Sequence, residues 1–163
     1  MANSRYIHAL GNGRYLQVCE WKGALKVDLR EWQDSVPTKK GISLSLSRWK
    51  SLVDAIETID QTLKDKRDYE SHLGGNVYCR VQQDNPCVDI RQHWKPENEV
   101  IATKKGICLR PLEYKRLKEV LPEIDQALPE LYAVVPCHLQ SDHMNQMIAL
   151  QCSECNPNDY MNW

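Results

Sequence analysis

We single out eight residues in the first quarter of the sequence, each of which is either positively charged or aromatic. They are Arg14, Trp21, Lys22, Lys26, Arg30, Trp32, Lys39 and Lys40. Lysine and arginine neutralise phosphates, and aromatic rings stack on unpaired bases for about 1–3 kcal/mol each. This chemistry suits single-stranded nucleic acid. Exposed lysines on a sheet also protect strand edges from unwanted pairing, so the residue types alone leave both interpretations open.

A second group of side chains, near the C-terminus, has the types that bind zinc. Cys152 and Cys155 have C-x-x-C spacing, and Cys137, His138 and His143 precede them. Four such ligands would hold zinc tetrahedrally. A single C-x-x-C pair is a weak signal, so we predict no metal site and expect unstructured thiols, with zinc as the alternative.

The sequence shows no Gly-rich phosphate loop, no nucleophile elbow and no pair of carboxylates on one element. We therefore expect a binding protein, not an enzyme, and no cofactor. The composition of 42% hydrophobic and 26% charged residues is typical of a globular protein. The net charge of −1 means that nucleic-acid binding would need a local basic face. No apolar run or signal core is present, so we expect no membrane association and seven reduced cysteines inside the cell.

The sequence contains an internal repeat. Residues 38–42, Thr-Lys-Lys-Gly-Ile, return 65 positions later as residues 103–107. Residues 27–30, Val-Asp-Leu-Arg, are echoed by 88–91, Val-Asp-Ile-Arg. Asp28 and Asp89 each stand two positions before an arginine, and we expect each to orient that arginine through an ion pair. The repeat predicts two copies of one structural unit.

Each copy is predicted to contain strands followed by a helix. Alternating polar and apolar residues predict strands over about residues 14–19 and 25–30 and from residue 42, with 32–40 as a loop containing Pro37. Apolar residues at helical spacing predict one helix after Ser45 or Ser47, either of which could cap it. They predict a second helix from Pro111, which Pro122 should kink.

A unit of about 60 residues is marginally stable alone, so two units should cover each other. We expect an α+β fold with a first unit at 10–66, a linker at 67–72, a second unit at 73–131 and an irregular tail at 132–163. The polar residues 1–13 are expected to lead into the first strand.

The repeated segments resemble the C-terminal domain of the transcriptional coactivator PC4/p15 (Sub1) family. The resemblance rests on residues 14–18, 21–23, 27–32 and 37–44, and on Trp49, Leu52 and Ile59 of the helix. Residues 88–94 and 104–109 carry it more loosely in the second copy. It implies that each unit is a curved antiparallel four-stranded sheet plus one helix. It also implies that the units pair through their helices as a pseudo-dimer within one chain, although further dimerisation stays possible.

The resemblance further implies sequence-independent binding of single-stranded or melted DNA by a nuclear coactivator of RNA polymerase II. General transcription factors and activators would be its protein partners. The family's DNA-contacting positions fall on Arg14, Trp21, Lys22, Arg30, Trp32 and Lys40 in the first unit, and on Arg91, Trp94 and Lys105 in the second. Lys26, Lys39 and Lys104 are expected to assist.

The second unit departs from the family pattern. Its first hairpin carries Gln82-Gln83-Asp84-Asn85 in place of the aromatic and basic residues. We therefore expect the first unit to bind more firmly, with Trp94, Lys104 and Lys105 as the main contribution of the second. The alternative is a protein-interaction adaptor that keeps the fold but has weakened or lost nucleic-acid binding.

Overall fold

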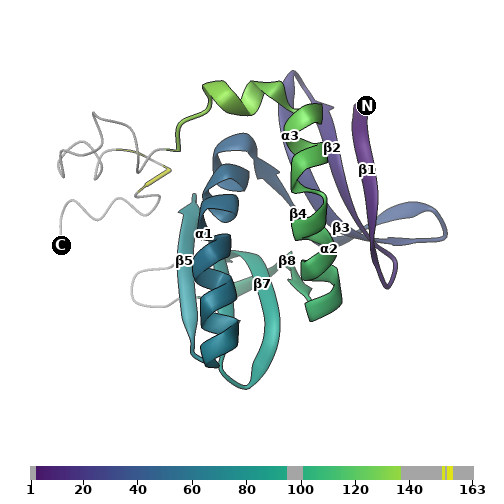
Figure 1. Ribbon diagram of the computed structural model, residues 1–163. Helices are drawn as coiled ribbons and strands as arrows, with labels where there is room; N and C mark the ends of the chain where they lie inside the picture. The colour runs from purple at the N-terminus through teal and green to yellow at the C-terminus, as the bar shows by residue number, and fades with distance from the viewer. Residues whose placement is uncertain (1–2, 95–100, 137–151, 153, 156–163) are drawn as a thin grey trace.

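The computed structural model describes residues 3–94, 101–136, 152 and 154–155. The chain forms two antiparallel four-stranded sheets (Figure 1). The first contains β1 (Asn3–Gly11), β2 (Arg14–Trp21), β3 (Ala24–Gln33) and β4 (Val36–Ser45), and α1 (Leu46–Asp65) follows it. The second contains β5 (Tyr69–Gly74), β6 (Val77–Gln82), β7 (Asn85–Trp94) and β8 (Ile101–Leu109). After it come α2 (Pro111–Glu119), α3 (Leu121–Ala127) and a 3-10 turn, η1 (Pro129–Ala133).

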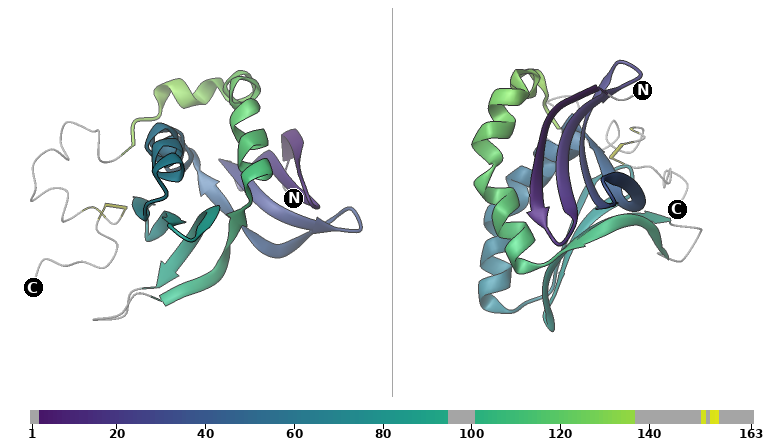
Figure 2. Two further views of the ribbon diagram at one scale, coloured as in Figure 1. Left: turned by 60° about the horizontal axis from the view of Figure 1, so that its bottom comes forward. Right: turned by 90° about the vertical axis from the view of Figure 1, so that its right-hand side faces the viewer.

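The helices form one layer over the two sheets and join the units (Figure 2). Helix α1 contacts β3 and β4 of its own sheet and β5 and β6 of the other. Helix α2 likewise contacts β7 and β8 of its own sheet and β1 of the first. Strand β4 also lies against β8. The predicted fold of two tandem units packed as an intramolecular pseudo-dimer is confirmed, with strands as well as helices at the contact between units.

One continuous core explains why the two units depend on each other. Leu16, Val27, Leu44, Val77 and Ile90 of both sheets belong to a single buried cluster. Trp49 of α1 and Tyr114 of α2 are buried in the same cluster, as their helical spacing predicts. The Tyr114 hydroxyl donates to Asp60 Oδ1 of α1 at 2.8 Å, which ties the two helices together.

The helix ends follow the sequence signals. Helix α1 begins after Ser45, whose Oγ accepts a hydrogen bond from the Arg48 backbone N–H at 3.3 Å. Pro111 occupies the first turn of α2, where its missing N–H costs no helical bond. The expected kink at Pro122 is a full break, since α2 ends at Glu119 and α3 begins at Leu121.

Four strands lie wholly or partly where the sequence predicted irregular chain. The expected loop at 32–40 is mostly strand, because β3 and β4 continue to a tight turn at Asp34 and Ser35, both with positive φ. The expected polar lead contains β1, and the expected linker at 67–72 overlaps β5. We propose that the first unit includes β1 and that the second unit includes β5, because each strand belongs to the sheet of that unit.

The repeated Lys-Lys-Gly run lies within strands β4 and β8, although Lys39 and Lys40 were expected in the loop at 32–40. Gly41 pairs with Arg30, and Gly106 pairs with Arg91, beside an irregularity in each ladder. A Cβ at Gly41 would lie 2.7 Å from the Arg30 Cα. Glycine is required here because the neighbouring strand approaches closely, while a turn plays no part.

Candidate nucleic-acid interface

The same three-residue contact orients one arginine in each unit. In the first, Arg30 Nη2 lies 3.1 Å from Asp28 Oδ1, and Arg30 Nη1 donates to the Thr38 carbonyl at 2.9 Å. The expected ion pair between the arginine and the preceding aspartate is confirmed. Because the guanidinium is held by a carboxylate and a carbonyl, it is fixed on the outer face of the sheet.

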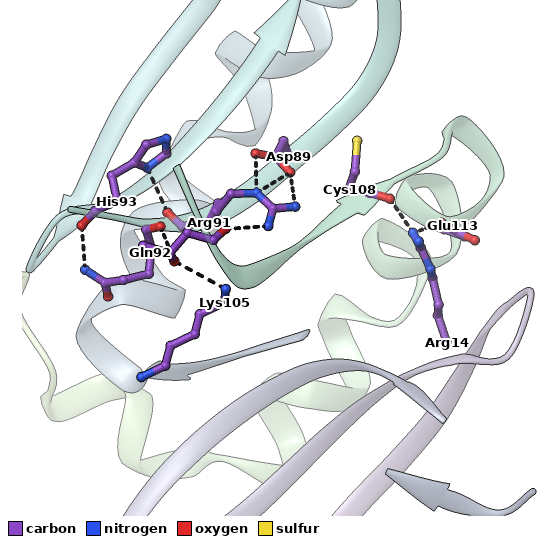
Figure 3. Close-up of polar contacts among 9 residues, drawn as sticks. Arg14, Asp89, Arg91, Gln92, His93, Lys105, Cys108 and Glu113 are labelled. Carbon is purple, nitrogen blue, oxygen red and sulfur yellow. Dashed lines mark hydrogen bonds and ion pairs between the residues drawn. The ribbon is translucent and has the colours of Figure 1, made fainter. Parts of the chain in front are cut away.

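The second unit repeats this contact (Figure 3). Arg91 Nη2 lies 3.0 Å from Asp89 Oδ1, and Arg91 Nη1 donates to the Thr103 carbonyl at 2.8 Å. The two orienting contacts therefore agree closely although the surrounding hairpins differ in sequence.

The threonine that opens each repeat fixes the strand before the lysines. Thr38 Oγ1 donates to the Glu31 carbonyl at 2.7 Å and accepts from the Lys40 N–H at 3.3 Å. Thr103 Oγ1 donates to the Gln92 carbonyl at 2.7 Å, and the Lys105 N–H donates to it at 3.2 Å. Our sequence interpretation gave these threonines no role, although their presence in both copies was a usable signal.

Positive side chains gather in a groove between the units, which we call the inter-unit groove. It has a volume of about 600 Å³. Its charged lining consists of Arg30, Lys39, Arg48, Lys104 and Lys105. No acidic residue is among the described residues that line it. The groove thus concentrates a local basic surface on a chain whose net charge is −1.

The structure does not bring all the predicted cations into this groove. Lys39 lines it and the exposed Lys40 does not. Lys26 lies on β3 opposite Ser45 of β4, outside the lining. Arg91 likewise lies outside the lining and is held by its contacts with Asp89 and Thr103.

Arg14 points into the contact between the units and away from solvent. Its Nη1 donates to the Cys108 carbonyl and lies 2.9 Å from Glu113 Oε1 (Figure 3). The side chains of Arg14 and Glu113 are 15% and 0% exposed. Asn12 Nδ2 also donates to Glu113 Oε2, at 2.8 Å. This ion pair joins the first sheet to α2.

The tryptophans have different environments. Trp32 packs on Tyr15, with ring centroids 5.5 Å apart, and its Nε1 has no hydrogen-bond partner among the described residues. Trp94, at the end of β7, is 60% exposed. Trp21 is 47% exposed beside the turn that contains Lys22, whose Nζ lies 5.9 Å from the Trp21 ring centroid. Among the tryptophans that the structure describes, Trp94 and Trp21 thus offer the most open ring faces for stacking.

Arg48 and Gln92 line the groove, although the sequence interpretation did not assign them to the site. Arg48 comes from the first turn of α1, and Gln92 comes from β7. Arg48 left no signal in the repeat, because the corresponding position of the second copy is Glu113. Gln92 was covered only by the general resemblance of residues 88–94.

The thiols near these strands are poor nucleophiles. Burial raises the pKa of Cys19, the pKa of Cys108 to about 11 and the pKa of Cys79 to about 12. These groups are therefore protonated near neutral pH, whereas thiol chemistry needs the thiolate.

The other sequence hypotheses concern residues that the structure describes only in part. Cys137, His138 and His143 lie outside the described residues. Within residues 3–94, 101–136, 152 and 154–155, no group of three or more His, Cys, Asp or Glu side chains could hold a metal ion. The same part of the chain contains no helix that is long and apolar enough to cross a membrane.

Comparisons with known proteins match both units separately. The family model described as Transcriptional Coactivator p15 (PC4) matches residues 8–55 and again residues 72–120, together more than half of the chain. No solved structure matches the chain significantly.

Curated relatives match over a single unit's length. A Caenorhabditis elegans protein is 41% identical over 58 residues, which are 32% of this chain and 47% of that protein. An RNA polymerase II transcriptional coactivator of Drosophila melanogaster is 38% identical over 55 residues, 31% of this chain and 50% of that protein. The RNA polymerase II transcriptional coactivator KIWI of Arabidopsis thaliana is 35% identical over 60 residues, 34% of this chain and 56% of that protein.

The chain spans about half the length of the curated relatives it matches. The twofold family match falls on the two sheets and on the helices that follow them, as the repeat predicts. The chain therefore belongs to the Transcriptional Coactivator p15 (PC4) family and carries two copies of its characteristic unit.

Proposed function

We propose that this protein binds single-stranded or melted DNA through the inter-unit groove and the neighbouring tryptophans, largely without regard to sequence. The observation that carries the proposal is the gathering of five cationic side chains, from both units, in one groove without described acidic lining. Phosphates need such cations, and unpaired bases need open ring faces such as those of Trp94 and Trp21. No base-specific contact is required by this arrangement.

We further propose that the protein acts in the nucleus as a coactivator of RNA polymerase II. Support comes from its family and from the two relatives whose names state that activity. General factors and activators would then be its protein partners. The proposal includes no cofactor and no catalytic step.

A titration of fluorescently labelled oligo-dT, repeated at several salt concentrations, tests the DNA proposal. We expect binding whose log affinity falls linearly with log salt, by about 0.7 for each phosphate contacted on a single strand. Absent binding, or binding that salt does not weaken, would overturn the proposal.

The two units are proposed to contribute unequally. Trp32 and the Trp21–Lys22 turn both lie in the first unit, whereas the outer face of the second contains the Arg80–Glu70 ion pair, 2.9 Å apart. We expect Trp21→Ala to weaken oligo-dT binding more than Gln82→Ala, the matched change at the end of β6. Equal losses would contradict the unequal contribution.

A protein-interaction adaptor is the alternative, favoured by the fixed guanidinium groups of Arg30 and Arg91 and by the net charge of −1. A variant with both Lys39→Gln and Lys104→Gln separates the two functions. If the protein is an adaptor, the variant should bind the protein partners with the affinity of the wild type, and neither protein should bind oligo-dT.

A further inference from the structure

Arg48 differs from the other cations of the inter-unit groove because a carboxylate from the C-terminal segment holds it. Arg48 Nε donates to Glu154 Oε1 at 2.6 Å, and Arg48 Nη2 donates to Glu154 Oε2 at 3.0 Å. Such a two-pronged contact is the geometry in which a guanidinium binds either a carboxylate or a phosphate.

The turn between β5 and β6 is shaped to receive Glu154. The Gly75 N–H donates to the Glu154 backbone carbonyl at 2.9 Å. A Cβ at Gly74 would lie 2.8 Å from Glu154 Cδ, and one at Gly75 would lie 2.9 Å from Arg48 Cζ. Two adjacent glycines therefore leave the space that the Arg48–Glu154 pair occupies.

The pseudo-symmetry of the molecule explains why this carboxylate comes from outside the two units. Arg48 and Glu113 stand six positions after Ile42 and Ile107, so they are counterparts. Glu113 pairs with Arg14 of the opposite sheet, whereas the counterpart of Arg14 by strand register is Val77. Arg48 thus faces no acidic partner in the opposite sheet, and Glu154 supplies one.

We propose that Arg48 is a further phosphate-binding residue of the groove, which Glu154 holds in the free protein and nucleic-acid phosphate takes over on binding. The inference rests on the proposed function, because it concerns the same groove. The Arg48 and Glu154 side chains are 24% and 28% exposed, so solvent and a ligand can reach the pair. Glu154 therefore competes with single-stranded nucleic acid for Arg48.

The test compares oligo-dT binding by Glu154→Gln with binding by Glu119→Gln, across a salt series. Glu119 is an exposed residue of α2, so its variant makes the same charge change elsewhere. In the Glu154→Gln variant, phosphate no longer has to displace a carboxylate from Arg48, so this variant should bind oligo-dT up to about fivefold more tightly than the wild type. The salt slope should stay the same, because Arg48 meets phosphate in both complexes. Glu119→Gln should leave the affinity nearly unchanged.

A second background assigns the effect to Arg48. In an Arg48→Gln protein, Glu154→Gln should no longer tighten binding. Equal behaviour of the two Glu variants, or persistence of the gain without Arg48, would overturn the inference while the proposed function stands. If the wild type does not bind oligo-dT at all, the proposed function fails and the inference fails with it.

Hydrogen exchange in the wild-type protein tests directly whether the contact between Gly75 and Glu154 breaks on binding. We expect the Gly75 amide to exchange slowly in the free protein and faster when oligo-dT saturates it, because Glu154 then leaves the turn. Unchanged exchange at Gly75 in the saturated complex would also contradict displacement.

Discussion

Gly41 and Gly106 each face an arginine on the neighbouring strand. A Cβ added to either glycine would lie 2.7 Å from the nearest carbon atom of that arginine. Because these glycines lack a side chain, they leave room for Arg30 and Arg91 on the neighbouring strands. The close approach of the neighbouring strand therefore explains the glycine at both positions.

We expect Gly41→Ala to destabilise the protein by about 1–3 kcal/mol, because the new methyl group overlaps fixed backbone atoms of β3. Urea unfolding followed by tryptophan fluorescence measures this. Ser43→Ala, on the same strand and exposed, should change the unfolding free energy by less than about 0.5 kcal/mol. A Gly41→Ala protein as stable as the Ser43→Ala control would contradict the packing account.

His93 should make folding stability depend on pH. It is 3% exposed, and burial lowers its pKa. Below about pH 6.5 the unfolded chain binds a proton at this position more readily than the folded chain. The stability contributed by neutral His93 is therefore present near neutral pH and lost as pH falls.

Urea unfolding at about pH 7 and about pH 5, in the wild type and in His93→Gln, checks this prediction. The wild type should lose more unfolding free energy between the two conditions than the variant does. An equal loss in both proteins would show that other groups determine the acid sensitivity.

At the scale of elements, the ion pair between Arg14 of β2 and Glu113 of α2 fixes one unit against the other. Arg14→Gln leaves the buried Glu113 carboxylate without its cation, and we expect a loss of about 3 kcal/mol. Arg5→Gln is the matched control. It breaks an ion pair with Glu130 whose side chains are 37% and 40% exposed, so we expect a loss within about 1 kcal/mol.

Equal losses in the two variants, measured by urea unfolding, would contradict the assignment of Arg14 to the contact between units. The residue pattern and the family resemblance both placed Arg14 among the DNA contacts. Its role could not be predicted from one unit, because Glu113 and the Cys108 carbonyl both come from the other.

The central strands and helices were predictable, and the sheet edges were not. Val27 and Leu29 of β3 are fully buried, so their alternation with polar residues marks the strand. β1 and β5 pair on one side only, and Leu10 is the sole fully buried residue described in β1. Polar edge strands of this kind have little apolar alternation to detect. Pro37 lies on β4, another edge strand, where proline is tolerated.

At the scale of the whole molecule, the repeat predicted two units but not how their side chains would meet. The groove forms because Lys39 of β4 and Lys104 of β8 come from strands that lie against each other. Lys39 lines the groove without Lys40, whereas Lys104 and Lys105 both line it. These placements depend on the contact between the strands and on strand register, which a linear sequence does not state. The same contact gives a chain of net charge −1 a concentrated basic surface.

The salt dependence of oligo-dT binding in two matched double variants tests the central claim most directly. Lys39→Gln with Lys104→Gln removes two groove cations, and Lys64→Gln with Lys115→Gln removes two exposed cations from the helices. We predict that the groove variant binds more weakly, and that its slope of log affinity against log salt is shallower by about 0.7 for each lysine removed. The helix variant should keep the wild-type slope. Identical slopes in the two variants would contradict binding through the inter-unit groove.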